Sequence, residues 1–215
     1  MYFCYHTENK NCGESTLYFI YLDSLKENMK NIIFVFLVLF SFSMQSQNLE
    51  IINSENAKGM DNWRIINDNV MGGISNSTMS QNSSGELVFK GSVSLENNGG
   101  FASCRLDISG IDLVGVSSFN LKVKGDGKVY QFRVGTINNY ANYCFDFETK
   151  KDQWIEVNIP IDRLKPRIMG RYSPQSPEFK IENTRRIGFL ISNKQEGEFN
   201  LEIMSVKGDQ AGINL

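Results

Sequence analysis

The stretch FNLKVKGDGKVYQFRV, from Phe119 to Val134, decides the fold class because two alternating segments flank a glycine-containing turn. Every second residue is hydrophobic from Phe119 to Val123, and the same holds from Tyr130 to Val134. Alternation of this kind is typical of a strand with one face on a core and the other in solvent. Gly-Asp-Gly between the segments favours a chain reversal. The stretch therefore predicts two half-buried β-strands.

The same period recurs along most of the chain beyond residue 60. The alternating hydrophobic residues are Leu87, Phe89, Val93 and Leu95; Tyr143, Phe145 and Phe147; Ile155, Val157 and Ile159; and Phe199, Leu201 and Ile203. Glycine and asparagine turns separate the runs, and no convincing amphipathic helix interrupts them. Eight to ten such strands predict an all-β fold, a single antiparallel β-sandwich of the jelly-roll kind. We expect its core to use the faces that carry Phe119, Tyr130, Phe132, Tyr143, Phe145 and Val157.

All four prolines fall between Pro160 and Pro177. Because proline removes a backbone donor, this segment is expected to be an irregular excursion between two strands, with one helical turn at residues 162–165. It also concentrates four positive side chains: Arg163, Lys165, Arg167 and Arg171. Such a loop either meets an anion at the rim of the sandwich or is simply solvated.

Composition excludes several classes of function. The 215 residues carry 22 Lys and Arg against 24 Asp and Glu, and a net charge of −2 gives no basic excess for nucleic acid. His6 is the one histidine, so loss of the N-terminus would exclude histidine-based catalysis and histidine-ligated zinc. There is no glycine-rich phosphate loop and no nucleophile elbow. We expect no cofactor and no metal.

The N-terminal part resembles an export signal. From Met29 the chain reads MKNIIFVFLVLFSFSMQSQ, a short positive region followed by an apolar run and small residues. We expect Met29 to be the native start, residues 1–28 an artefactual extension and residues 29–46 a signal peptide cleaved after Ser43 or Ser46. Residues 47–215 would then form one exported domain, periplasmic or secreted, with no stable membrane span. An uncleaved anchor is the alternative, although the apolar run is short for a bilayer.

Two cysteines lie in the expected mature domain, Cys104 and Cys144. Export to an oxidising compartment permits a disulfide between them, and two buried free thiols are the alternative. Strand adjacency decides between the two, because a bridge needs close Cα atoms.

Three motifs carry a family resemblance: WRIINDNVMGGISNS (Trp63 to Ser77), FKGSVSLENNGGFASCR (Phe89 to Arg105) and IGFLISNKQEGEFNLEI (Ile187 to Ile203). Together they resemble the complex I intermediate-associated protein 30 family, over about residues 63–206. The resemblance implies a galactose-binding-like β-sandwich. It also implies a chaperone-like role in complex I assembly for the mitochondrial members, from which this chain departs by its export signal.

The first motif is interpreted as a turn. Asn67, Asp68 and Asn69 suit hydrogen bonds to nearby backbone amides, and the Gly-Gly pair allows a close reversal. Trp63 and Met71 are expected to pack beneath this turn. A calcium site is the alternative, but Asp68 flanked by amides supplies little charge for one.

Candidate binding residues come from the polar faces of the later strands. If the strands around residues 131 and 145 form a hairpin, Gln131 faces Asp146 and Arg133 faces Cys144. Trp154 and Glu156 occupy the same kind of face in the next strand. The candidate ligand or partner site therefore comprises Arg133, Asp146, Trp154, Glu156, Arg167 and Arg171. The alternative is a plain polar surface with Trp154 tucked under the proline-containing loop.

Arg105 projects from a mid-strand position, where it is expected either in a salt bridge or in an exposed binding region. The salt bridge is the favoured interpretation, because unpaired buried charge is rare.

Three functions fit these observations. The first is a non-enzymatic binding or assembly module that holds a protein client or partner. The second is a carbohydrate-binding module of a secreted system, for which Trp154 and its polar neighbours are the argument. The third is a glycoside hydrolase that uses two carboxylates among Glu96, Asp146 and Glu156.

Overall fold

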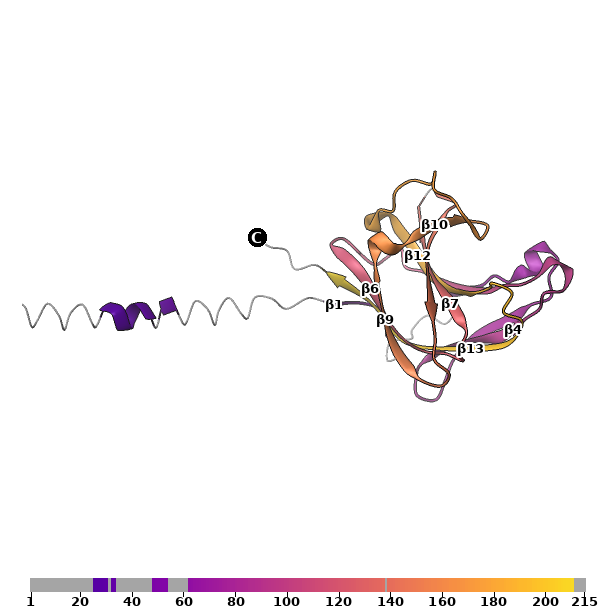
Figure 1. The fold of residues 1–215 in the computed structure, drawn as a ribbon, viewed down its shortest axis with the longest axis horizontal. Coiled ribbons are helices and arrows are strands. Elements are labelled where there is room, and N and C mark those ends of the chain that lie inside the picture. The colour runs from indigo at the N-terminus through magenta and orange to yellow at the C-terminus, as the bar shows by residue number, and fades with distance from the viewer. Residues whose placement is uncertain (1–24, 31, 34–47, 54–61, 138, 211–215) are drawn as a thin grey trace, which may run out of the picture. The chain divides into compact units, whose positions relative to one another are not determined.

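Two antiparallel sheets make up the domain in the computed structural model, which describes residues 25–30, 32–33, 48–53, 62–137 and 139–210 (Figure 1). Within these residues, one sheet (sheet A) has six strands in the order β3-β4-β13-β6-β9, with β1 also paired to β13. The other (sheet B) has seven in the order β11-β10-β8-β7-β12-β5-β2. The predicted all-β antiparallel sandwich is therefore confirmed.

The strand bounds follow the sequence patterns closely. Sheet A comprises β1 (Asn48–Asn53), β3 (Asn76–Gln81), β4 (Leu87–Val93), β6 (Val116–Lys124), β9 (Trp154–Pro160) and β13 (Gly197–Gln210). Sheet B comprises β2 (Trp63–Ile65), β5 (Ala102–Asp107), β7 (Val129–Thr136), β8 (Asn142–Glu148), β10 (Lys165–Ile168), β11 (Arg171–Tyr172) and β12 (Thr184–Ile191). Four 3-10 turns interrupt the described strands: η3 (Asp68–Met71), η4 (Glu96–Asn98), η5 (Ile161–Arg163) and η6 (Ile181–Asn183).

The core lies between the two sheets. The turn after β6 carries the chain from sheet A to sheet B, so the rings of Phe119 and Phe132 meet across the core with centroids 5.2 Å apart. Tyr130 and Tyr143 are buried as well, while Phe145 and Val157 pack against the core from partly buried positions. The faces predicted to form the core are those that do so.

The proline-containing segment is more regular than expected. The predicted helical turn is present as η5, but Lys165–Ile168 forms a strand that pairs with both β8 and β11. A single proline in a short strand near the sheet edge removes one donor and leaves the neighbouring residues free to pair. Residues 165–172 therefore form a small hairpin that extends sheet B.

Cys104 and Cys144 are both buried free thiols. Cys104 faces the core, whereas Cys144 lies on the other face of sheet B, since it is the register partner of Arg133. Strands β12 and β7 lie between β5 and β8, so three strand spacings, about 14 Å, separate the strand of Cys104 from the strand of Cys144. That distance exceeds the span of a disulfide. The structure therefore supports two buried free thiols and not a disulfide between Cys104 and Cys144.

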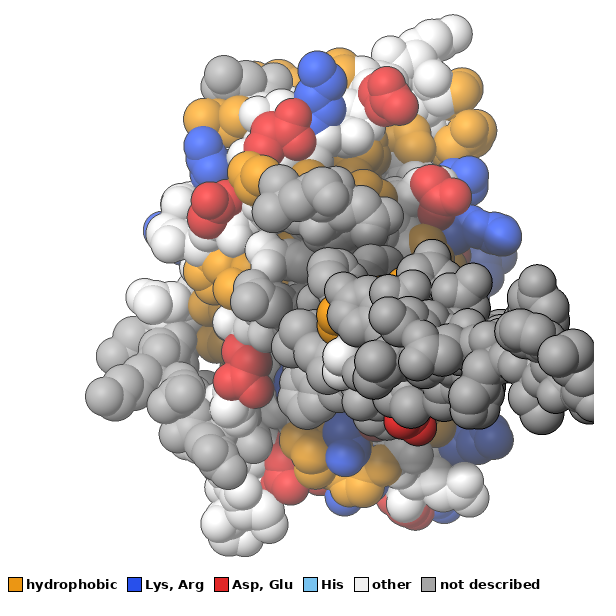
Figure 2. Space-filling model, turned by 90° about the vertical axis from the view of Figure 1, so that its left-hand side faces the viewer, with side chains coloured by type: hydrophobic (Ala, Val, Ile, Leu, Met, Phe, Trp, Pro, Cys, Tyr) orange, Lys and Arg blue, Asp and Glu red, His pale blue; other side chains and the backbone are white. Residues whose placement is uncertain are grey.

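The chain divides into two units, residues 1–45 and 46–215, each considered by itself. In the first, residues 25–30 and 32–33 are helical, and most of the expected signal peptide with both cleavage sites lies outside the described residues. No helix in the described part of the chain is long and apolar enough to cross a membrane. Figure 2 shows acidic, basic and hydrophobic side chains interspersed on the visible side of the molecule.

Candidate functional site

The outer face of sheet B gathers most of the basic side chains that β-strand alternation turns away from the core. In the cross-strand register, Arg64 lies opposite Arg105, and both Arg105 and Arg133 lie opposite Gly188 of β12. One step along, Arg186 lies opposite Gly135. We call this surface the arginine face, defined by the outward residues Arg64, Arg105, Arg133, Arg167 and Arg186.

The hairpin predicted from the sequence is confirmed. Gln131 is the register partner of Asp146, and Arg133 is the partner of Cys144. The Gln131 amide donates to one Asp146 oxygen at 2.5 Å, and Arg167 Nη2 donates to the other at 2.8 Å. Asp146 is therefore fixed from two sides, and Arg167 does join Arg133 and Asp146 on one surface.

Trp154 and Glu156 do not belong to this surface, and the expected platform that combined them with Arg133 is wrong. Both lie on β9, which pairs with β6 in sheet A, and they project from the outer face of that sheet. The Lys124 ammonium lies 5.1 Å from the centroid of the Trp154 ring and binds Glu202 at 2.8 Å. The hairpin at residues 165–172 does not cover this ring, because it pairs at the edge of sheet B.

The pairing of β11 with β10 places the candidate residues Arg167 and Arg171 on different faces of sheet B. Arg171 is the partner of Ile168, whereas Tyr172 is the partner of Arg167, so alternation places Tyr172 and not Arg171 on the side of the arginine face. The Tyr172 side chain is 62% exposed. Sequence reasoning missed this tyrosine because its segment was expected to be irregular, and only a hairpin at residues 165–172 aligns it with sheet B.

Arg105 forms no salt bridge with any residue that the structure describes, which overturns the favoured interpretation of this residue. On the arginine face, the ion pair between Arg167 and Asp146 is the only one among the described residues. Burial lowers the pKa of Arg105, and the positive charges of Arg133 and Arg186 lower it further. Its surroundings are therefore cationic, the opposite of a structural pair.

Two glycines on the outer face of sheet B lie where there is no room for a side chain. A Cβ on Gly135 would lie 2.4 Å from Nε of Arg186, whose side chain therefore occupies the space over Gly135. A Cβ on Gly188 would lie 2.2 Å from the Cys104 carbonyl oxygen. Strand β12, which lies between Arg105 and Arg133, therefore carries no side chain at Gly188, the position opposite both arginines.

The turn predicted from the first motif is confirmed for Asp68. Its carboxylate is 1% exposed and accepts hydrogen bonds from the Ser75 amide (2.9 Å), the Ser75 hydroxyl, the Gly100 amide (2.7 Å) and the Phe101 amide (3.3 Å). Burial acts to raise the pKa of Asp68, but these hydrogen bonds outweigh it and hold the pKa below its ordinary value. Asp68 thus ties η3 to the loop before β5, and Gly73 makes room for it.

The two hydrophobic residues expected beneath this turn differ in position. Trp63 packs against the core, as predicted, but Met71 is exposed because it lies on the outward side of the short 3-10 turn.

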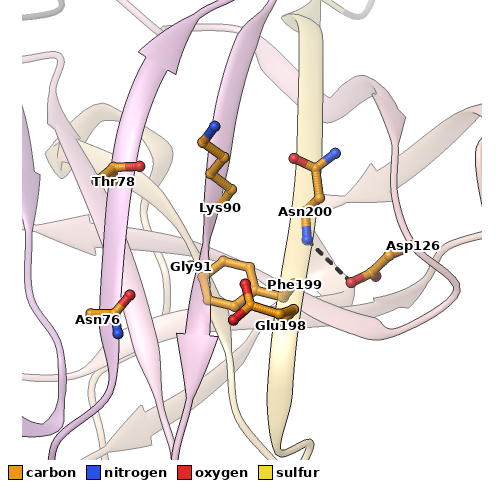
Figure 3. Close-up of a pocket in the computed structure, with 8 residues that line it drawn as sticks. All are labelled: Asn76, Thr78, Lys90, Gly91, Asp126, Glu198, Phe199 and Asn200. Carbon is orange, nitrogen blue, oxygen red and sulfur yellow. Dashed lines mark hydrogen bonds between the residues drawn. The ribbon is translucent and has the colours of Figure 1, made fainter.

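A concave surface lies on the outer face of sheet A. It holds a cavity of about 530 Å³. Thr78, Lys90 and Asn200 lie side by side on three neighbouring strands of its lining (Figure 3). The backbone amide of Asn200 donates to the Asp126 carboxylate at 3.1 Å. The one ring in its lining, Phe199, is 3% exposed and belongs to the core. This cavity offers polar groups without an aromatic surface.

The carboxylates considered for hydrolysis are dispersed. Glu96 lies in η4, Asp146 on β8 of sheet B, and Glu156 on β9 of sheet A. The outer faces of the two sheets point away from each other, so Asp146 and Glu156 do not flank a common bond.

Residues 52–203, more than half of the chain, match the sequence profile described as "Complex I intermediate-associated protein 30 (CIA30)". The chain belongs to this family. The resemblance seen in the three motifs is thereby confirmed. No curated protein matches this CIA30 member in sequence.

The solved structures similar to this chain include carbohydrate-binding modules. The family 11 module of the cellulosomal cellulase Lic26A-Cel5E of Clostridium thermocellum aligns with a TM-score of 0.59 at 14% identity, over 78% of this chain and 96% of that one. The family 11 module of the same organism in complex with a β-1,3-1,4-mixed-linked tetrasaccharide aligns with a TM-score of 0.58 at 15% identity, covering 78% and 98%. At identities this low, the two alignments show that the fold is shared and show nothing about function.

Proposed function

We propose that this CIA30 member is an exported, non-enzymatic module that binds a carbohydrate on the outer face of sheet B. The observation that carries the proposal is the alignment of the exposed Tyr172 ring with Arg167, whose guanidinium in turn fixes Asp146. An apolar ring beside a few oriented polar groups is the arrangement that recognises a sugar, which has one apolar face and a rim of hydroxyls. The fold it shares with carbohydrate-binding modules agrees with this role.

Each group has a defined part in such binding. Tyr172 offers a rigid contact surface with few torsions to freeze, so stacking on it costs little side-chain entropy. The Asp146 carboxylate accepts from hydroxyls with its remaining lone pairs, and Arg133 and Arg167 donate. No bond cleavage is proposed, because the candidate carboxylates lie on different faces.

Affinity electrophoresis in gels that contain soluble polysaccharides tests the proposal, with mixed-linked β-1,3-1,4-glucan as one of the probes. Tyr172→Ala should weaken binding by about 10-fold or more, the size of a single binding hot spot. Trp154→Ala is the matched control, since it removes a larger ring from the opposite sheet and should leave binding unchanged. Loss of binding in Trp154→Ala but not in Tyr172→Ala would transfer the site to sheet A.

A protein partner is the second candidate function, and it draws on a different surface. Three exposed apolar side chains lie in or just after the η3 turn: Val70 and Met71 within it, and Ile74 three residues beyond it. Clustered exposed hydrophobic residues are typical of contacts with another chain. The family description names an association with a complex I intermediate. In cross-linking experiments in cells, the double variant Val70→Ser and Met71→Ser should lose a partner that Tyr172→Ala retains. Equal cross-linking in all three proteins would reject this candidate.

Export rests on the pattern of residues 29–46. N-terminal sequencing of the protein from the extracytoplasmic fraction should find Met44 or Gln47 as the first residue. A chain that begins at Met1 would reject both the cleavage and the artefactual extension.

A further inference from the structure

Three arginines of the arginine face form no ion pair among the described residues, and this bears on the charge of the proposed ligand. Arg105, Arg133 and Arg186 come from three neighbouring strands, β5, β7 and β12, and each guanidinium is partly withdrawn from solvent. Positive side chains on a sheet surface are ordinarily solvated or paired with carboxylates. These three are neither fully solvated nor ion-paired within the described part of the chain.

Two of the three also hold a buried donor without an acceptor. Nε of Arg133 and Nε of Arg186 are inaccessible to solvent and make no hydrogen bond in the described structure. A buried donor left without a partner costs free energy, and more so when the group is charged. The neighbouring carboxylates form no ion pair with these three arginines among the described residues. Asp146 binds Arg167 and Gln131, and Asp107, the register partner of Arg186, accepts from the Ser109 amide.

We infer that the carbohydrate recognised by the arginine face is acidic, with carboxylate or sulfate groups that bind Arg105, Arg133 and Arg186. This inference rests on the proposed carbohydrate binding and specifies its ligand class. Guanidinium donors form a planar fork that matches the oxygens of a carboxylate or a sulfate, and such charge-assisted hydrogen bonds are the strong ones. An anionic group would offset the mutual repulsion of the three guanidinium groups, which a neutral sugar cannot do.

The low pKa of Arg105 fits this arrangement, because the first cause is burial and the second is the charge of its two neighbours. Three arginines on three strands also favour a ligand with more than one charge. A polysaccharide with charged groups along its length meets that requirement on an open sheet face.

The test compares four probes at low ionic strength: neutral β-1,3-1,4-glucan, a polyuronate, a sulfated galactan and poly-glutamate as a polyanion that is not a carbohydrate. The native protein should bind the polyuronate or the sulfated galactan at least about 10-fold more tightly than the other two, and added salt should weaken that binding. Whichever of the two acidic polymers binds more tightly identifies the source of the charge as carboxylate or sulfate.

Two variants connect this binding to the arginines. Arg105→Gln should weaken binding of the acidic polymer by about 10-fold, the effect of one charge-assisted hydrogen bond. Gly135→Ala removes no charge, but its Cβ displaces Arg186 and should also weaken binding. Arg163→Gln is the matched control, an exposed arginine on η5 outside the arginine face, and should bind as the native protein does. Thermal unfolding of each variant verifies the fold, and Arg105→Gln is expected to be no less stable than the native protein.

The outcomes separate the inference from the proposed function. Equal binding of neutral and acidic glycans, unaffected by Arg105→Gln, would overturn the acidic ligand and leave carbohydrate binding in place. No binding to any glycan would overturn both. Binding of poly-glutamate as tight as that of the acidic polysaccharides would also overturn both, and would indicate an acidic protein segment.

Discussion

Asp68 offers the sharpest test of how the domain is held together. Asp68→Ala would leave the backbone amides of Ser75, Gly100 and Phe101 without their acceptor. The Ser75 amide is fully buried and the other two are partly so; at about 1–3 kcal/mol for a fully buried donor, with discounts where water enters, the loss is about 3 kcal/mol. For a domain of this size that corresponds to a fall in Tm of about 6–12 °C.

Differential scanning calorimetry at pH 7 measures this loss, with Asp112→Ala as the matched control. Asp112 is an exposed aspartate that accepts one backbone hydrogen bond, from the Val114 amide at 3.0 Å. Its replacement should cost less than about 1 kcal/mol. Equal Tm changes in the two variants would refute the reasoning that burial and the number of donors decide the cost.

The same carboxylate makes stability depend on pH in a defined direction. The pKa of Asp68 in the folded domain lies below the ordinary 3.8, so the folded state favours the charged form. Its contribution is therefore complete above about pH 4 and is lost as the pH falls through the lower, folded-state pKa. The Tm difference between the native protein and Asp68→Asn should narrow only below about pH 4. Narrowing between pH 7 and pH 5 would contradict the low pKa.

Two further predictions concern stability and thiol chemistry. Gly188→Ala should destabilise the domain by more than about 2 kcal/mol, because the new Cβ meets the Cys104 carbonyl oxygen, whereas Gly110→Ala has open space and should be nearly neutral in chemical denaturation. Cys104 and Cys144 should react with a thiol reagent at pH 8 only after unfolding, because burial raises the pKa of both thiols. Rapid labelling of Cys144 in the native protein would show that the arginine face is more open than described.

The strands were predictable because their signal is local. A hydrophobic period of two, as in Phe119 to Val123, depends only on which face of a strand is buried. The contact between Gln131 and Asp146 was predictable for a related reason: a short connection between β7 and β8 fixes their register. The turn at Asp68 belongs to the same class, since aspartate and glycine signals act within a few residues.

The composition of the candidate site was only partly predictable, because alternation assigns a residue to a face and not to a sheet. Trp154 alternates as Asp146 does, yet β9 pairs with β6, which is some 30 residues earlier, and so enters the other sheet. Tyr172 was hidden for the opposite reason, since prolines around residue 166 suggest an irregular segment. The first error comes from long-range strand pairing, for which no short motif gives a signal. The second comes from a local hairpin that the prolines made unexpected.

The unpaired arginines are the part of the structure that folding alone does not explain. Arg105 and Arg133 lie two strand spacings apart, about 10 Å, where two unit charges repel by about 0.4 kcal/mol in a water-like dielectric and about 1.7 kcal/mol at an effective dielectric of 20. Neutral polar residues at these positions would remove this repulsion and the unsatisfied donors beside it. Local arrangements that oppose stability concentrate where a protein binds or reacts. A ligand with negative charge would offset this repulsion, and the free energy so gained would strengthen its binding. For this reason the arginine face, and not the cavity on sheet A, is the site to test first.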